Sequence, residues 1–114
     1  MDAYRKVQLQ QAGIDVDGML ERFMGNDSLA ERFLKQFPSD ENMQRLMAAL
    51  AADDNSAALT AAHTLKGVCG NLSMSRLYSL LTRQVAAMRA DDWQGAAALM
   101  PEIIQAYHQV IQAL

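Results

Sequence analysis

Residues 55–72, NSAALTAAHTLKGVCGNL, predict one helix with two unlike faces. Advancing about 100° per residue, one face collects apolar residues at alternating spacings of four and three, which is typical of a buried seam: Ala58, Ala62, Leu65, Cys69 and Leu72. The opposite face collects His63 and the residues within roughly 60° of it, namely Leu59, Thr60, Lys66, Gly67 and Gly70. We therefore expect the imidazole of His63 to point outward.

The segments on either side of this helix have the same helical periodicity. Two helices are expected before residue 55. The first stops near Pro38 and has four apolar residues on one face: Leu29, Phe33, Leu34 and Phe37. The second has four residues that face inward: Met43, Leu46, Met47 and Leu50. After residue 72, Ser73 is expected to cap a helix that presents Met74, Leu77, Tyr78, Leu81, Val85 and Met88 at spacings of three and four.

The last helical segment begins near Asp91 or Asp92 and carries an apolar stripe that includes Trp93, Ala97, Met100, Ile103, Ile104, Tyr107, Val110, Ile111 and Leu114. Pro101 lies within it and lacks a backbone donor, so we expect a kink or a break there. Four substantial amphipathic helices with short connections predict an all-α fold, an antiparallel up-down-up-down four-helix bundle. Short additional helices are expected in residues 1–26, with the bundle in residues 27–114.

Length and composition agree with one such domain over residues 1–114. The chain is 51% hydrophobic but only 6% aromatic, and it contains eight Met, as expected for helices packed through small and unbranched side chains. Its net charge of −3 gives no reason to expect nucleic-acid binding. A single cysteine and the lack of any apolar run of about 20 residues favour a cytoplasmic protein, or the cytoplasmic part of a membrane-bound sensor kinase, without membrane insertion.

The face around His63 is unusual for a solvated helix surface, because glycine costs roughly 1 kcal/mol relative to alanine inside a helix. With no side chain at Gly67 or Gly70, the backbone of a partner could come close to the imidazole. Lys66 could place an ammonium beside a dianionic phosphoryl group. A neutral imidazole is a competent nucleophile at phosphorus. The pattern therefore favours a histidine that carries a phosphoryl group.

The run Ala62-His63-Thr64-Leu65-Lys66-Gly67, followed by Gly70-Asn71-Leu72 and a second amphipathic helix, resembles the signature of histidine phosphotransfer (HPt) domains. The motif spans residues 62–77, and the resemblance extends over about residues 28–114. It implies that His63 is phosphorylated through its outward ring nitrogen, that Lys66 stabilises the phosphoryl charge, and that Gly67 leaves room for the partner. The family commonly has glycine at the position of Ser73 and a small residue at that of Cys69.

The resemblance implies a carrier in a phosphorelay, not an enzyme. Its partners would be response-regulator receiver domains and a hybrid sensor histidine kinase, with docking contacts from Leu59, Thr60, Gly70 and Asn71. The chain has no Gly-rich nucleotide-binding segment, so we expect no phosphorylation from ATP by the chain itself. No intrinsic cofactor is expected, because the receiver domain would supply Mg²⁺. We expect the carrier to act as a monomer.

Two other functions fit parts of the sequence. The same exposed patch could dock and regulate a receiver or a histidine kinase without being phosphorylated. A dimerisation and phosphoacceptor helix pair of a histidine kinase would need a four-helix dimer, whereas this chain has enough helices for its own bundle. His108 has no motif around it and is expected to be an ordinary surface residue. A metal site made of His63, Cys69 and His108 is disfavoured, because Cys69 lies opposite His63 on one helix.

Overall fold

A computed structural model describes all residues, 1–114, as eight α-helices and one 3-10 turn without strands. The elements in chain order are α1 (Ala3–Gln11), α2 (Val16–Arg22), α3 (Asp27–Gln36), the 3-10 turn (Phe37–Ser39), α4 (Asn42–Ala51), α5 (Asn55–Asn71), α6 (Ser75–Arg89), α7 (Trp93–Ala98) and α8 (Met100–Ala113). None of these helices combines the length and the apolar character that a membrane-spanning segment requires.

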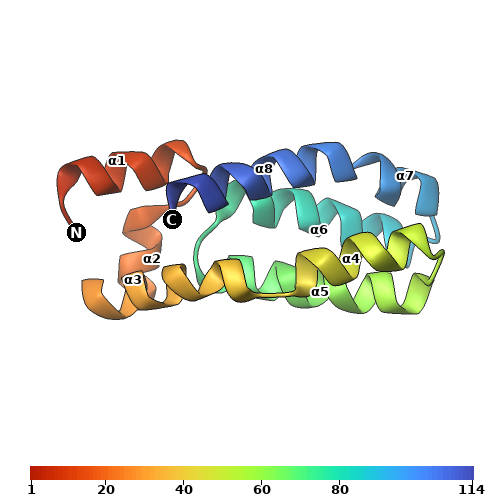
Figure 1. Cartoon of the computed structure of the whole chain (residues 1–114), viewed down its shortest axis with the longest axis horizontal. Helices are drawn as coiled ribbons and strands as arrows, with labels where there is room; N and C mark the ends of the chain where they lie inside the picture. Colours follow the sequence, from red (N-terminus) through yellow and green to blue (C-terminus); the bar gives the residue numbers. More distant parts are fainter.

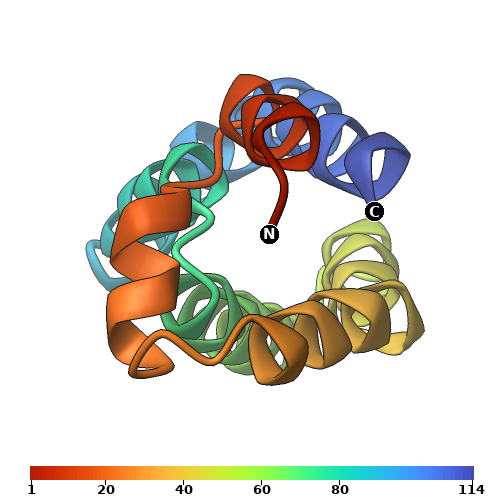
Figure 2. The same ribbon diagram turned by 90° about the vertical axis from the view of Figure 1, so that its left-hand side faces the viewer.

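The four arms of the bundle are α4, α5, α6 and the pair α7–α8, and consecutive arms run in opposite directions (Figure 1). Helix α5 packs against α4 on one side and α6 on the other, and α6 in turn packs against α7 and α8. Seen from the end that carries the N-terminal helices, the arms surround a common interior (Figure 2). The predicted antiparallel up-down-up-down bundle with short N-terminal helices is confirmed.

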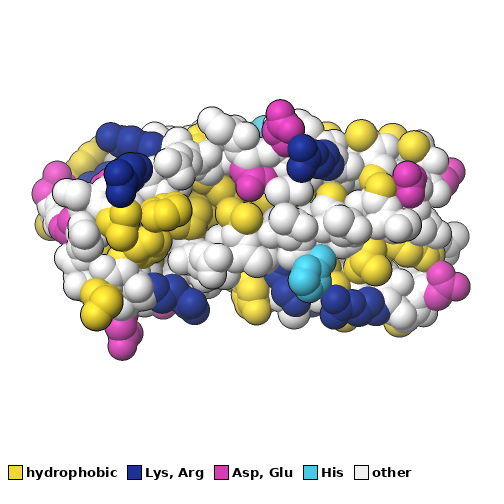
Figure 3. All heavy atoms as spheres, turned by 90° about the horizontal axis from the view of Figure 1, so that it is seen from below, with side chains coloured by type: hydrophobic (Ala, Val, Ile, Leu, Met, Phe, Trp, Pro, Cys, Tyr) yellow, Lys and Arg dark blue, Asp and Glu magenta, His cyan; other side chains and the backbone are white.

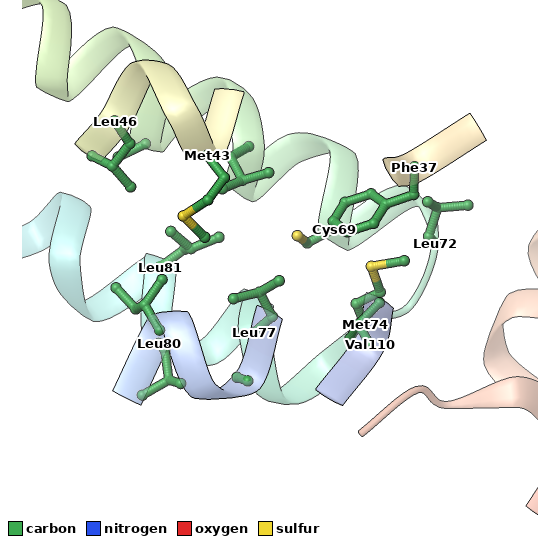
Figure 4. Packing of buried hydrophobic residues seen from close by; sticks show 14 of the residues in the cluster. Phe37, Met43, Leu46, Cys69, Leu72, Met74, Leu77, Leu80, Leu81 and Val110 are labelled. Atoms are coloured by element: carbon green, nitrogen blue, oxygen red, sulfur yellow. The ribbon is translucent and has the colours of Figure 1, made fainter. Parts of the chain in front are cut away.

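The core lies between these arms, where side chains from α4, α5, α6 and α8 meet (Figure 4). All members of the predicted α5 seam are at most 5% exposed, which confirms the two-faced helix: Ala58, Ala62, Leu65, Cys69 and Leu72. Three residues expected on apolar faces are substantially exposed instead: Phe33 (43%), Met47 (46%) and Tyr78 (40%). Helix α4 packs mainly on α5, so its buried stripe is narrow and leaves Met47 outside.

The break expected at Pro101 is confirmed, because α7 ends at Ala98 and α8 begins at Met100. The inward residue of α7 is Ala96 and not Ala97, which is exposed. Gln84 on α6 is fully buried beside this break, and its Nε2 donates a hydrogen bond to the Ala96 carbonyl at 3.0 Å. A polar side chain in the core thus binds a backbone carbonyl next to the interruption.

The turn between α5 and α6 corrects the prediction for Ser73. Its backbone is in the left-handed region (φ 52°). The N-cap residue of α6 is Met74, and no side chain caps this helix. Ser73 is therefore not the cap of α6. The turn needs a left-handed residue at this point, a conformation that glycine adopts without strain.

The N-terminal helices are anchored on the same turn. The Asp15 N–H donates to the Ser73 carbonyl at 2.8 Å, and the Arg76 N–H donates to the Gly13 carbonyl at 3.3 Å. Gly13 has a φ of 87°, and a Cβ added there would come within 2.9 Å of the Arg76 Cβ, so glycine is required for this close approach. At the far end of α1, Arg5 pairs with Glu31 at 3.1 Å.

Candidate functional site

His63 lies in the middle of α5 with its side chain exposed. The helix begins where Oδ1 of Asp54 accepts a hydrogen bond from the Ala57 N–H at 3.1 Å, which satisfies one of the free donors of the first turn. Burial of the α5 seam then fixes the rotation of the helix about its axis. Because His63 is on the opposite side from that seam, the packing itself turns its imidazole to solvent.

The surface beyond His63 is open at Gly67. A Cβ added to Gly67 would meet no atom within 4 Å. Lys66, beside it, is half-buried, and its ammonium takes part in none of the four salt bridges of the protein. The structure thus places an exposed imidazole, an unpaired cation and a helix segment without a side chain on one face.

The second glycine of this face, Gly70, has a different environment. A Cβ added there would lie 3.1 Å from Cε2 of Tyr78 on α6, which is tighter than ordinary van der Waals contact. Gly70 therefore allows an aromatic ring of the same chain to lie against α5. The positions of the two glycines around the helix axis could not distinguish their environments, because the difference arises from the neighbouring helix.

A hollow of about 450 Å³ lies on this face, between Lys66 and the end of α5. Four of the residues singled out from the sequence line it: Lys66, Gly67, Gly70 and Asn71. Leu59 is instead half-buried against the core, and Thr60 lines a separate hollow between α4 and α5. The carbonyl of Thr60 accepts a hydrogen bond from the Thr64 hydroxyl at 2.8 Å. The structure brings four of the six surrounding residues into one depression.

The hollow is also lined by Ser75 of α6 and by two residues from the N-terminal part of the chain, none of which the sequence analysis singled out. The two N-terminal residues are Asp15 and Arg22. They lie more than 40 positions before Lys66 and reach the site because the α1–α2 linker pairs with the α5–α6 turn. Asp15 caps α2, since its Oδ1 accepts from the Gly18 N–H at 3.1 Å. No local sequence pattern predicts that these two residues lie beside α5, because their position depends on tertiary structure.

The remaining candidates lie apart from this face. Cys69 is fully buried, and Figure 4 shows it in the bundle interior with Phe37, Met43 and Leu77. Burial, with a smaller contribution from the negative charge of Asp40, raises the pKa of the Cys69 thiol to about 12. His108 is on α8, where its ring lies 5.9 Å from that of Tyr107. No three His, Cys, Asp or Glu side chains are grouped in a way that could hold a metal ion.

An outward histidine on the second arm of an antiparallel helical bundle, beside a lysine and an open glycine, is the arrangement expected of a phosphotransfer domain. The family model of the Hpt domain matches residues 28–113, which is most of the chain, and the protein belongs to this family. Members of the family are phosphocarriers of phosphorelays and have no kinase site of their own. Comparisons with curated proteins and with solved structures find no match.

Proposed function

We propose that His63 is the phosphoacceptor of a phosphorelay carrier, which takes a phosphoryl group from a receiver-domain aspartyl phosphate and passes it to a response-regulator aspartate. The observation that carries this proposal is the exposure of His63 beside Gly67, whose missing side chain leaves open space. An aspartyl phosphate held in the active site of another protein needs such an approach, because the attacking nitrogen must come within about 3–3.5 Å of the phosphorus.

The transfer step requires little of this chain beyond position and charge. The lone pair of the outward ring nitrogen of neutral His63 attacks phosphorus, an N–P bond forms, and the bond between phosphorus and the aspartyl oxygen breaks. The electron pair of that bond returns to the carboxylate, and the imidazole releases the proton from its other nitrogen to the surrounding water. The reverse sequence of bond changes moves the phosphoryl group to the next aspartate.

The neighbours of His63 have separate roles in this proposal. Lys66 stabilises the negative phosphoryl oxygens, and Gly67 admits the partner backbone. Leu59, Thr60, Gly70 and Asn71 contact the docked receiver around this centre. The receiver domain supplies Mg²⁺ from its own active site, and the carrier needs no cofactor of its own. Receivers and a hybrid histidine kinase are the partners.

A pulse and chase of radioactive phosphate tests the relay. The chain is incubated with a receiver domain phosphorylated on its aspartate, separated from it, and mixed with a second receiver. We expect label to enter the chain and then leave it, and we expect H63Q to take up none. The variant H108Q is the matched control, because His108 is the other histidine of the chain. Receiver binding that survives H63Q, with no transfer in the wild type, would instead favour a docking module that is never phosphorylated.

A further inference from the structure

Arg22, the last residue of α2, lies at the border between two depressions of the surface. It lines the hollow that contains Lys66, Gly67 and Gly70, and it also lines a larger one of about 770 Å³ between α2, α3 and the end of α5. Asn71 is shared by the same two depressions. The side chain of Arg22 is exposed and takes part in none of the four salt bridges. An unpaired guanidinium is thus held next to the proposed phosphotransfer face.

The larger depression, which we call the aromatic groove, is apolar on much of its surface. Its hydrophobic lining residues are Phe23, Phe33, Phe37, Val68 and Leu72. The rings of Phe23 and Phe33 are stacked at a tilt with centroids 5.4 Å apart, and Phe33 is 43% exposed. Figure 3 shows hydrophobic side chains gathered toward the α2–α3 end of the face that α3, α4 and α5 form. Exposed aromatic side chains that flank a cation are typical of protein interfaces.

The position of α2 is fixed relative to α5, so this surface is built in advance of binding. Backbone hydrogen bonds tie Gly13 and Asp15 to the turn that follows α5, and Asp15 caps the first turn of α2. At 1.5 Å per residue, Asn71 is about 12 Å along α5 from His63. One partner can cover both places, because a standard interface buries about 800 Å² on each side.

We propose that Arg22 and the aromatic groove are a second contact region for the receiver domain. This inference rests on the proposed function. A receiver presents carboxylates, since its Mg²⁺ needs oxygen ligands, and a planar guanidinium pairs with carboxylates in two parallel hydrogen bonds. Arg22 therefore pairs with acidic groups at the rim of the receiver active site, while Phe33 packs against apolar side chains beside them. Both residues lie on the two helices that precede the bundle arms.

The test measures transfer from the phosphorylated carrier. Wild-type protein and variants are phosphorylated with phosphoramidate, which needs no partner protein, and are mixed with the receiver domain from the same genome that the wild type phosphorylates fastest. We expect R22Q to transfer the phosphoryl group roughly two- to fivefold more slowly than the wild type at low ionic strength. Added salt should lower the transfer rate of R22Q less than it lowers that of the wild type. We expect F33A to weaken binding of this receiver about tenfold.

Matched controls separate docking from general effects. The variant R89Q removes the same charge from the exposed end of α6, and M47A removes a side chain as exposed as Phe33 from α4. Transfer rates of R22Q and F33A that equal those of R89Q and M47A would overturn the inference while leaving the proposed function intact. A wild type that phosphoramidate does not label on His63 would overturn the proposed function itself. Self-association of the wild type that F33A abolishes would assign the groove to a second copy of the chain, and so contradict the inference.

Discussion

Gly70 lies against the ring of Tyr78 so closely that a Cβ on the glycine would come within 3.1 Å of Cε2 of the ring. Three residues earlier, the Cβ position of Gly67 faces open space. Two glycines on one face of α5 therefore serve different purposes. Gly70 makes room for a side chain of the same protein, and Gly67 leaves room for something outside it.

This difference predicts opposite outcomes for two alanine variants. In G67A the added methyl group meets nothing, so the free energy of unfolding should rise by up to about 1 kcal/mol from helix propensity. The methyl group should nevertheless hold the partner back and slow phosphotransfer at least about tenfold. In G70A the added methyl group would force the Tyr78 ring to move, so we expect no such increase in the free energy of unfolding. Thermal melts and transfer assays check both, and G67A with wild-type transfer would show that Gly67 is not at the interface.

Lys66 should contribute to transfer through its charge, since its ammonium is free of any ionic partner. We expect K66A to slow phosphoryl transfer or to shorten the lifetime of phosphohistidine, and K66R to retain most of the wild-type behaviour. The melting temperature should change little, because the residue is not part of the core. The control is K35A, which removes an exposed lysine from α3. Equal kinetics in K66A and K35A would remove Lys66 from the site.

Ser73 pays a conformational penalty in the turn after α5, because it is a non-glycine residue with a φ of 52°. We expect S73G to increase the free energy of unfolding by up to about 1 kcal/mol, measured by urea denaturation. The same change at Ser75, the first residue of α6, should decrease it, because glycine costs helix stability where φ is negative. A destabilised S73G would mean that the Ser73 side chain contributes more than its backbone strain costs.

Cys69 should make the fold sensitive to alkali. Its folded pKa of about 12 is well above the ordinary thiol value of 9.0, so the buried neutral thiol contributes its full stability below that ordinary value. The contribution is lost progressively as the pH rises from that ordinary value to about 12, because the thiol of the unfolded chain ionises first. Between pH 7 and pH 10.5 the wild type should lose on the order of 2 kcal/mol more than C69A does. Equal losses in urea titrations at the two pH values would contradict this burial effect.

Most of the fold could be predicted from the helical periodicity of the sequence. The seam of α5 and the outward direction of His63 follow from spacing alone, because a helix with one apolar face has only one way to bury it. The break near Pro101 follows from a missing backbone donor. Periodicity could not show how widely each helix is covered by its neighbours, which is why Met47 and Phe33 are exposed.

The surroundings of the site were less accessible to sequence reasoning. Lys66 and Gly67 could be predicted because they lie within a turn of His63 on the same helix. Arg22 could not, since it reaches this surface only through the pairing of the α1–α2 linker with the turn at Ser73. The unusual conformation of Ser73 was hidden for a similar reason, because serine is a common helix cap and its backbone strain has no signature in the sequence.

The proposed relay depends on the exposed imidazole of His63 carrying the phosphoryl group. The most direct measurement is to locate the phosphoryl group chemically, by tandem mass spectrometry at alkaline pH of the chain after incubation with a phosphorylated receiver. We expect a single modification on His63 that is stable in alkali and lost in acid. Modification of His108, of a carboxylate or of a hydroxyl group, with His63 unmodified, would show that His63 is not the phosphoacceptor.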